Sequence, residues 1–172
     1  GVSSSEPTAV KTDGESQHST TAAEAKPIER VAGAKAPDIS IHRAAREGNI
    51  EAVKQHLVAG TDVKSRDKYG GTPLHFSAIF GRKKICEMLI ANGADVNAKD
   101  GESMMTPLLG AAAKGQKEII ELLIAKGADI NAKNAFNRTP VDAASDFKHN
   151  ETVELLRKHG GKTGEELKAE GK

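Results

Sequence analysis

Residues 93–99 read GADVNAK, and residues 127–133 repeat them as GADINAK. A second motif keeps the same register, because residues 72–75 read TPLH, residues 106–109 read TPLL and residues 139–142 read TPVD. The two steps between these copies are 34 and 33 residues. Such a period is typical of repeat architectures, in which each unit is too small to bury its own apolar face and packs it against the next unit.

Each unit predicts two short helices joined by a tight turn. In the second unit, Thr72 is a good N-cap and Pro73 suits the first helical position, so a helix begins there and stops at Gly81. A second helix begins at about Lys83 and ends before Gly93. Helices this short are not stable alone in water, so stacking between units must stabilise them.

A unit of 33 residues with these motifs and a mid-unit glycine resembles the ankyrin repeats. The resemblance covers about residues 38–160 and implies an all-α solenoid of four helix-turn-helix units with short β-hairpin fingers. The expected repeats are residues 38–70, 71–104, 105–137 and 138–160. The first and fourth units depart from the motif, as terminal units with one solvated face do. Leu89 and Leu122 are expected in the core between repeats.

The segments outside the repeats have a different composition. Residues 1–37 contain no aromatic residue and few bulky aliphatic residues, so we expect a disordered leader or linker that folding does not need. Residues 161–172 form the C-terminal tail. Thr163 and Glu166 have the spacing of a capping box, which predicts a short helix that packs Leu167 on the fourth repeat.

The composition excludes several classes of protein. A formal net charge of +1 argues against the broad basic surface that nucleic acids or anionic bilayers require. One cysteine, Cys86, can form neither an intramolecular disulfide nor a cysteine zinc cluster. The longest apolar stretch, residues 108–113, is far shorter than the roughly 18 residues that a membrane span needs.

No pattern of residues indicates catalysis. The resemblance implies a structural role for His75, bonded to Thr72 and the neighbouring unit, and Cys86 lies on a packed helix face as a small apolar residue. Residues 160–163 read GGKT but lack the upstream glycine and the strand of a phosphate-binding loop. The histidines show no metal-binding spacing. We therefore expect no enzyme activity, no cofactor and no metal.

The function is expected to lie in the surface of the stack. The family usually binds another protein through its concave face and fingers, and in this chain those positions are rich in aromatic residues, methionine and arginine, the profile of an interface core. The residues assigned to partner binding are Arg66, Lys68, Tyr69, Phe80, Lys99, Glu102, Met104, Met105, Lys114, Phe136 and Arg138.

Within this set, a one-residue insertion between Asp100 and Thr106 predicts a protruding finger with Met104 and Met105 at its centre. Arg66, Lys68, Lys99 and Arg138 are expected to form a charged rim. A neutral loop insertion is the alternative. For Phe80 and Phe147, packing between neighbouring helices is an equal alternative.

Two rival functions remain open: a structural spacer without a partner site, and an enzyme with an unrecognised site. The leader and the ending after His159 also resemble small bacterial ankyrin-repeat proteins, which often carry an export or lipoprotein signal. Because the chain begins at Gly1, the compartment stays open between an exported or tethered protein and a cytoplasmic one. We expect a monomer, and the sequence does not identify its partner.

Overall fold

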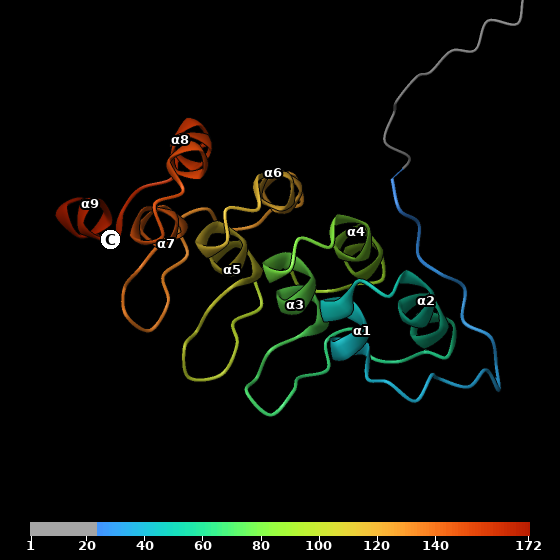
Figure 1. Ribbon diagram of the computed structural model, residues 1–172. Helices are drawn as coiled ribbons and strands as arrows, with labels where there is room; N and C mark the ends of the chain where they lie inside the picture. The colour runs from blue at the N-terminus through green and yellow to red at the C-terminus, as the bar shows by residue number, and fades with distance from the viewer. Residues whose placement is uncertain (1–23) are drawn as a thin grey trace, which may run out of the picture.

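The computed structural model describes residues 24–172, which form nine helices and no strand. The inner row consists of α1 (Ile41–Glu47), α3 (Pro73–Ile79), α5 (Pro107–Ala113) and α7 (Pro140–Asp146). The outer row consists of α2 (Ile50–Val58), α4 (Lys83–Ala91), α6 (Lys117–Ala125) and α8 (Asn150–Lys158). Figure 1 shows the two rows end-on, with three loops extending from the inner row, and the all-helical solenoid expected from the repeats is confirmed.

The inner helices begin where the Thr-Pro motif places them. Thr106 accepts a hydrogen bond on its side chain from the amide of Leu109 at 3.2 Å, which satisfies one of the open donors of the first turn. Thr139 and Asp142 form a capping box at the start of α7. Each inner helix is only seven residues long, so its stability depends on its neighbours.

Small residues let the inner helices approach one another closely. Ala44, Ala78 and Ala111 are fully buried in the inner row. A Cβ atom on Gly110 would lie 2.6 Å from Cγ1 of Ile79 on the neighbouring helix, so α3 and α5 meet at a position where no larger residue fits without a shift. This close contact explains how a chain with 3% aromatic residues packs a dense core.

The outer helices supply the larger core side chains. Ile85, Leu89, Leu123 and Leu156 are almost completely buried between the rows and between neighbouring repeats. Leu122 is only half-buried and lies toward the outer edge of α6. The expectation for Leu89 is therefore met, whereas Leu123 takes the core position that we expected for Leu122.

The C-terminal end of the stack is covered by α9 (Gly164–Ala169). The helix begins with a capping box between Thr163 and Glu166, and Leu167 is buried. Thr139 donates a hydrogen bond from its hydroxyl to the carbonyl of Lys162 at 2.6 Å, which fixes the segment before the helix. The end of the fourth repeat is therefore shielded from solvent.

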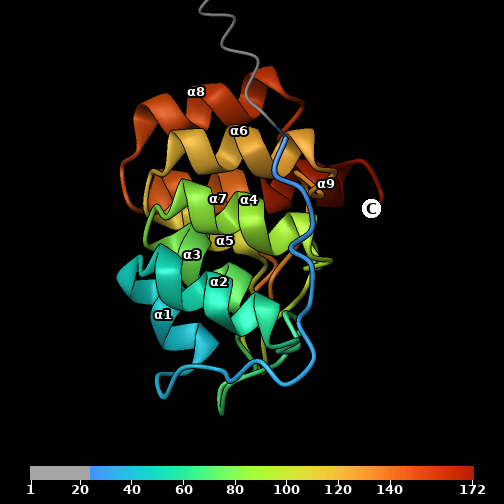
Figure 2. The same cartoon turned by 90° about the vertical axis from the view of Figure 1, so that its right-hand side faces the viewer.

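Residues 24–31 form an extended segment along the outer row and are followed by a turn at residues 32–33, although we expected residues 1–37 to be a disordered leader. The amide of Val31 donates to the carbonyl of Val58 at 2.9 Å, and Ile28 packs against the core. Figure 2 shows this segment in blue, running along the stack beside the ends of the outer helices. The structure differs from the expectation because these contacts reach residues far away in the sequence. Residues 1–23 lie outside the described residues.

Candidate functional site: the finger tips and the inner row

Three fingers connect each outer helix to the next inner helix. Each is closed by one backbone hydrogen bond: from Asp67 to Gly71 at 2.9 Å, from Asp100 to Met105 at 2.9 Å, and from Asn134 to Arg138 at 3.0 Å. The fingers are hairpin-shaped loops, and within residues 24–172 none contains an assigned strand. The expected β-hairpins are too short to form a ladder of hydrogen bonds.

Acidic and amide side chains at equivalent positions shape the three turns. The side chain of Asp67 accepts from the amides of Tyr69 at 3.0 Å and Gly71 at 2.8 Å. Asn134 does the same for Phe136 at 2.9 Å in the third finger. These positioning residues are absent from the sequence prediction, although an Asp or Asn at the same position of every finger is a turn signal that could have revealed them.

The fingers are tied to one another at their tips. The amide of Gly101 donates to the carbonyl of Tyr69 at 3.0 Å, and the amide of Ala135 donates to the carbonyl of Ser103 at 3.0 Å. A Cβ atom on Gly101 would lie 2.6 Å from the carbonyl oxygen of Tyr69, so residue 101 must be small for the first two fingers to meet. The three tips therefore hold a fixed register.

Three exposed apolar side chains stand on these tips, one on each finger. Tyr69 is 71% exposed, Phe136 75% and Met104 41%. We call these three residues the finger-tip surface. Figure 1 shows the three loops side by side below the inner row.

Met105 does not belong to the finger-tip surface, which corrects the expectation of a methionine pair at one tip. Its side chain is half-buried against the core, and its amide donates to the carboxylate of Asp100 at 2.9 Å. Its carbonyl also bonds to the imidazole of His75 at 2.9 Å. Met104 is 41% exposed with a left-handed φ of +53°, whereas Met105 packs against the core, so the two neighbours do not share one surface.

A second exposed row follows the C-terminal ends of the inner helices. Phe80 is 42% exposed after α3, and Phe147 is 62% exposed after α7, with the exposed Lys114 between them in the repeat order. The guanidinium of Arg46 lies 5.2 Å from the centre of the Phe80 ring. Exposure of this size argues against both rings serving only to fill space between helices.

The basic residues of the fingers bind neighbouring fingers more than they form a free rim. Arg66 donates to the carbonyl of Lys99 at 2.6 Å, and the ammonium of Lys99 lies 3.5 Å from the carbonyl of Lys133. Lys133 in turn donates to the carbonyl of Lys172 at 3.0 Å. Arg66 and Lys99 therefore differ from the expected rim, since their side chains span the gap to the next repeat.

Arg138 is also engaged within the molecule. Its guanidinium donates to the carboxylate of Asp146 and lies 3.8 Å from Asp142, and the hydrogen bond to Asp146 is the main cause that raises the pKa of Arg138. Lys68 and Glu102 remain exposed, and the ammonium of Lys68 lies 4.8 Å from the centre of the Tyr69 ring. Of the charged residues predicted to bind a partner, only Lys68 and Glu102 thus remain exposed at the finger tips without a partner in another finger.

His75 links the second and third repeats. Its Nδ1 accepts from the amide of Thr72 at 3.1 Å, so the ring proton lies on Nε2, which donates to the carbonyl of Met105 at 2.9 Å. Burial lowers the pKa of His75 against the opposing effect of this backbone hydrogen bond. These contacts are the structural ones that the resemblance implies.

Cys86 is buried, and burial raises the pKa of its thiol to about 11, which keeps it protonated at neutral pH. In the part of the chain that the structure describes, no group of three or more acidic, histidine or cysteine side chains could hold a metal ion. No helix formed by residues 24–172 is both long and apolar enough to cross a bilayer.

Fold and surface together define a helical repeat protein with linked fingers and an exposed apolar surface on them. The chain belongs to the ankyrin-repeat family, because the model for ankyrin repeats in three copies matches residues 41–134 and 103–166. The expected family is therefore confirmed.

Three relatives illustrate the family. Cyclin-dependent kinase 4 inhibitor B of Bos taurus is 31% identical over 124 residues, which cover 72% of this chain and 94% of that protein. Protein phosphatase 1 regulatory subunit 27 of Homo sapiens is 38% identical over 63 residues, covering 37% of this chain and 41% of that protein. Palmitoyltransferase akr1 of Neurospora crassa is 40% identical over 67 residues, covering 38% of this chain and 9% of the enzyme.

The chain thus spans nearly the whole first relative and less than half of the other two. These three organisms are eukaryotes, so the matches give no support to the resemblance to small bacterial ankyrin-repeat proteins. The match to the palmitoyltransferase covers a small part of that protein and carries no argument for catalysis in this chain.

Proposed function

We propose that this chain is a non-catalytic interaction module that binds another protein through its finger-tip surface. The observation that carries the proposal is the exposure of Tyr69, Met104 and Phe136 on three tips tied together by backbone hydrogen bonds. Aromatic and methionine side chains are the usual anchors of interface cores. Fixed tips also reduce the ordering entropy that binding would otherwise cost.

The conformation of Met104 supports the same proposal. Its φ is +53°, in the left-handed region, where the equivalent positions of the other fingers carry Gly70 and Asn137. Glycine and asparagine adopt this conformation readily, whereas a methionine there costs about 1 to 2 kcal/mol. A structural spacer gains nothing from a strained, exposed methionine, and a partner site gains an adaptable apolar side chain.

The inner row extends the proposed site. Phe80 and Phe147 add apolar area at the helix ends, and Arg46 and Lys114 place positive charge beside them. The partner that fits this surface presents apolar side chains toward the tips and acidic groups toward the inner row. Two relatives have names that describe an inhibitor of a kinase and a regulatory subunit of a phosphatase, and binding to another protein is the property that we carry over from them.

The same proposal treats the chain as a monomer. Ile39 packs against the core at the first repeat, and Leu167 of α9 is buried at the last. Within residues 24–172, both ends of the stack thus carry an apolar side chain of the chain's own flanking segments, which disfavours stacking on a second copy. Sedimentation analysis should give the mass of one chain, and a dimer would contradict this part of the proposal.

The test begins with the full chain immobilised as bait in an extract of its native cell, followed by mass spectrometry of what it retains. A recovered protein is then offered to a double variant, Tyr69→Ser with Phe136→Ser. Both side chains are exposed, so the fold should stay intact while affinity falls at least about tenfold.

The matched control is Ile50→Ser, which removes an apolar side chain that is 38% exposed at the start of an outer helix. This variant should retain the recovered protein. Equal retention by the finger-tip variant and the control would contradict the proposed site and place the partner elsewhere on the surface.

A further inference from the structure

The extended segment formed by residues 24–31 meets the outer row once in each of three consecutive repeats. The amide of Val31 donates to the carbonyl of Val58 at the end of α2, and the amide of Ile28 donates to the side chain of Asn92 after α4, both at 2.9 Å. The carboxylate of Glu24 lies 3.3 Å from the ammonium of Lys126 after α6. Asn92 and Lys126 are the C-cap residues of α4 and α6, and Val58 is the last residue of α2, so all three partners lie at the C-terminal ends of outer helices.

The spacing of these contacts matches the geometry of an extended chain on a helical stack. Neighbouring packed helices lie about 8 to 10 Å apart, and an extended chain advances about 3.3 Å per residue. Three residues therefore span about one repeat, and the contacts fall at residues 31, 28 and 24. The spacing of the contacts along the segment therefore matches the spacing of the repeats.

The outer row provides hydrogen-bond acceptors for the amides of the segment as well as an apolar surface for its side chains. Asn92 donates from its amide to the carbonyl of Met88 at 2.7 Å, which holds its oxygen toward Ile28. The carbonyl of Val58 belongs to the last turn of its helix, where carbonyls lack helical partners, and Val31 satisfies it. Two successive repeats thus each accept a hydrogen bond from a backbone N–H of the segment, as in the recognition of extended peptides through their main chain.

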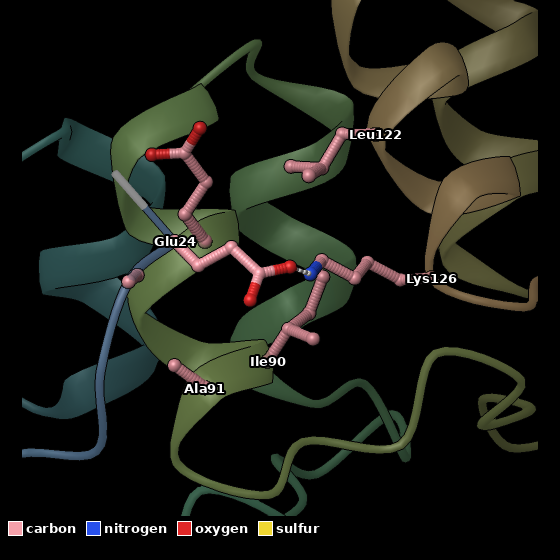
Figure 3. Close-up of a pocket in the computed structure, with 7 residues that line it drawn as sticks. Glu24, Ile90, Ala91, Leu122 and Lys126 are labelled. Carbon is pink, nitrogen blue, oxygen red and sulfur yellow. Dashed lines mark hydrogen bonds and ion pairs between the residues drawn. The ribbon is translucent and has the colours of Figure 1, made fainter. Parts of the chain in front are cut away.

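Side chains divide the segment into a covered and an open face. Ile28 packs on the core and is half-buried, whereas Val31 is 56% exposed although its amide is bonded. At its N-terminal end the segment borders a cavity of about 410 Å³ between α4 and α6, lined by Glu24, Ile90, Leu122 and Lys126. Figure 3 shows the Glu24 carboxylate crossing this cavity toward Lys126.

We propose that the surface along the C-terminal ends of α2, α4 and α6 is a binding site for an extended peptide, and that residues 24–31 are its ligand within the same chain. The ligand is defined by a bonded amide with an apolar side chain at position 28, a bonded amide three residues later, and an acidic residue four residues earlier. The exposed ion pair at Glu24 orients this ligand and contributes little to its affinity. This site is separate from the finger-tip surface.

The test uses the full chain and measures amide hydrogen exchange by NMR. The amides of Ile28 and Val31 should exchange at least about tenfold more slowly than those of Glu29 and Arg30, because only the first pair has fixed acceptors. Ile28→Ser should release both amides, and the matched variant Val31→Ser should leave them protected. Exchange of Ile28 and Val31 at the rate of an unstructured chain would overturn the proposal.

A second measurement tests this surface of the outer row as a binding site. A synthetic peptide of residues 24–34 is added to the Ile28→Ser protein while the side-chain amide signal of Asn92 is followed. The signal should shift with saturation at millimolar peptide, and at least about tenfold less in the unmodified protein, where the tethered segment competes at high effective concentration. No shift in the variant, or equal shifts in the two proteins, would overturn the proposal.

Discussion

The two sides of the stack treat their apolar residues in opposite ways. On the outer row, the half-buried Ile90 and Leu122 lie beside a segment of the same chain that contacts three successive repeats. On the fingers, Tyr69 and Phe136 are more than two-thirds exposed, although the ammonium of Lys68 lies over the Tyr69 ring. The molecule thus shields one apolar surface with its own residues and presents the other, which is why we place the partner on the fingers.

The largest expected effect concerns the core that both sides share. Leu89→Ala should lower the free energy of unfolding by about 2 to 5 kcal/mol, because Leu89 is fully buried between repeats and leaves a cavity. Leu122→Ala should cost about 1 kcal/mol or less, since Leu122 is half-buried at the outer edge. Urea unfolding measures both, and equal losses would show that the assigned faces of α4 and α6 are wrong.

The next effect tests the covered side. A chain that begins at residue 38 should unfold with a free energy about 1 to 2 kcal/mol lower than the whole chain, because it loses Ile28 and the amide contacts of residues 24–31. This reverses the expectation that residues 1–37 do not matter for folding. A chain that begins at residue 24 is the control and should match the whole chain. Equal stability of all three would mean that residues 24–37 add nothing.

Two substitutions by glycine are expected to increase the stability of the fold, and they separate the finger tips from the rest of the molecule. Lys148 and Met104 both have a left-handed φ, of +61° and +53°, so Lys148→Gly and Met104→Gly should each stabilise the fold by about 1 kcal/mol. Their effects on binding should differ, because only Met104 belongs to the finger-tip surface. Met104→Gly should weaken the recovered complex while Lys148→Gly leaves it unchanged. Equal affinities would remove Met104 from the site.

Much of this architecture could be predicted from sequence because local rules decide it. Thr72 and Pro73 start α3 where expected, and Gly81 takes a φ of +69° directly after the C-cap of that helix. Each of these signals is weak alone, but they recur in successive repeats. The repeat period and the helix pairs can therefore be predicted from the sequence. The exposure of Tyr69 and Phe136 followed from their place in the turns.

The remaining features depend on contacts between distant residues. The bond between Ile28 and Asn92 joins positions 64 residues apart, and a polar leader gives no periodic signal for it. Met105 and Met104 are neighbours of the same type, so composition could not tell which one points inward. Arg66 was assigned to a rim because its charge is visible in the sequence, whereas the carbonyl of Lys99 that binds it is not.

The smallest effect is on the pH dependence of stability. Burial lowers the pKa of His75, so the folded state keeps the imidazole neutral at a pH where the unfolded chain already binds a proton. The contribution of the neutral His75 to stability should be fully present above about pH 6.5 and should fall as the pH decreases toward the lowered pKa. Unfolding free energies between about pH 7.5 and about pH 5 should decline less steeply in His75→Gln than in the unmodified chain. The same slope in both would assign the decline to other groups.

The most direct test of the finger-tip surface is hydroxyl-radical footprinting of the chain alone and with its recovered partner. Exposed aromatic and methionine side chains are oxidised readily, so Tyr69, Met104 and Phe136 should all react in the free chain. In the complex their oxidation should fall by about tenfold or more, while Ile50 on the outer row and Val31 on the segment beside it keep their free rates. Protection of the outer row with unchanged oxidation of the three tips would contradict the account.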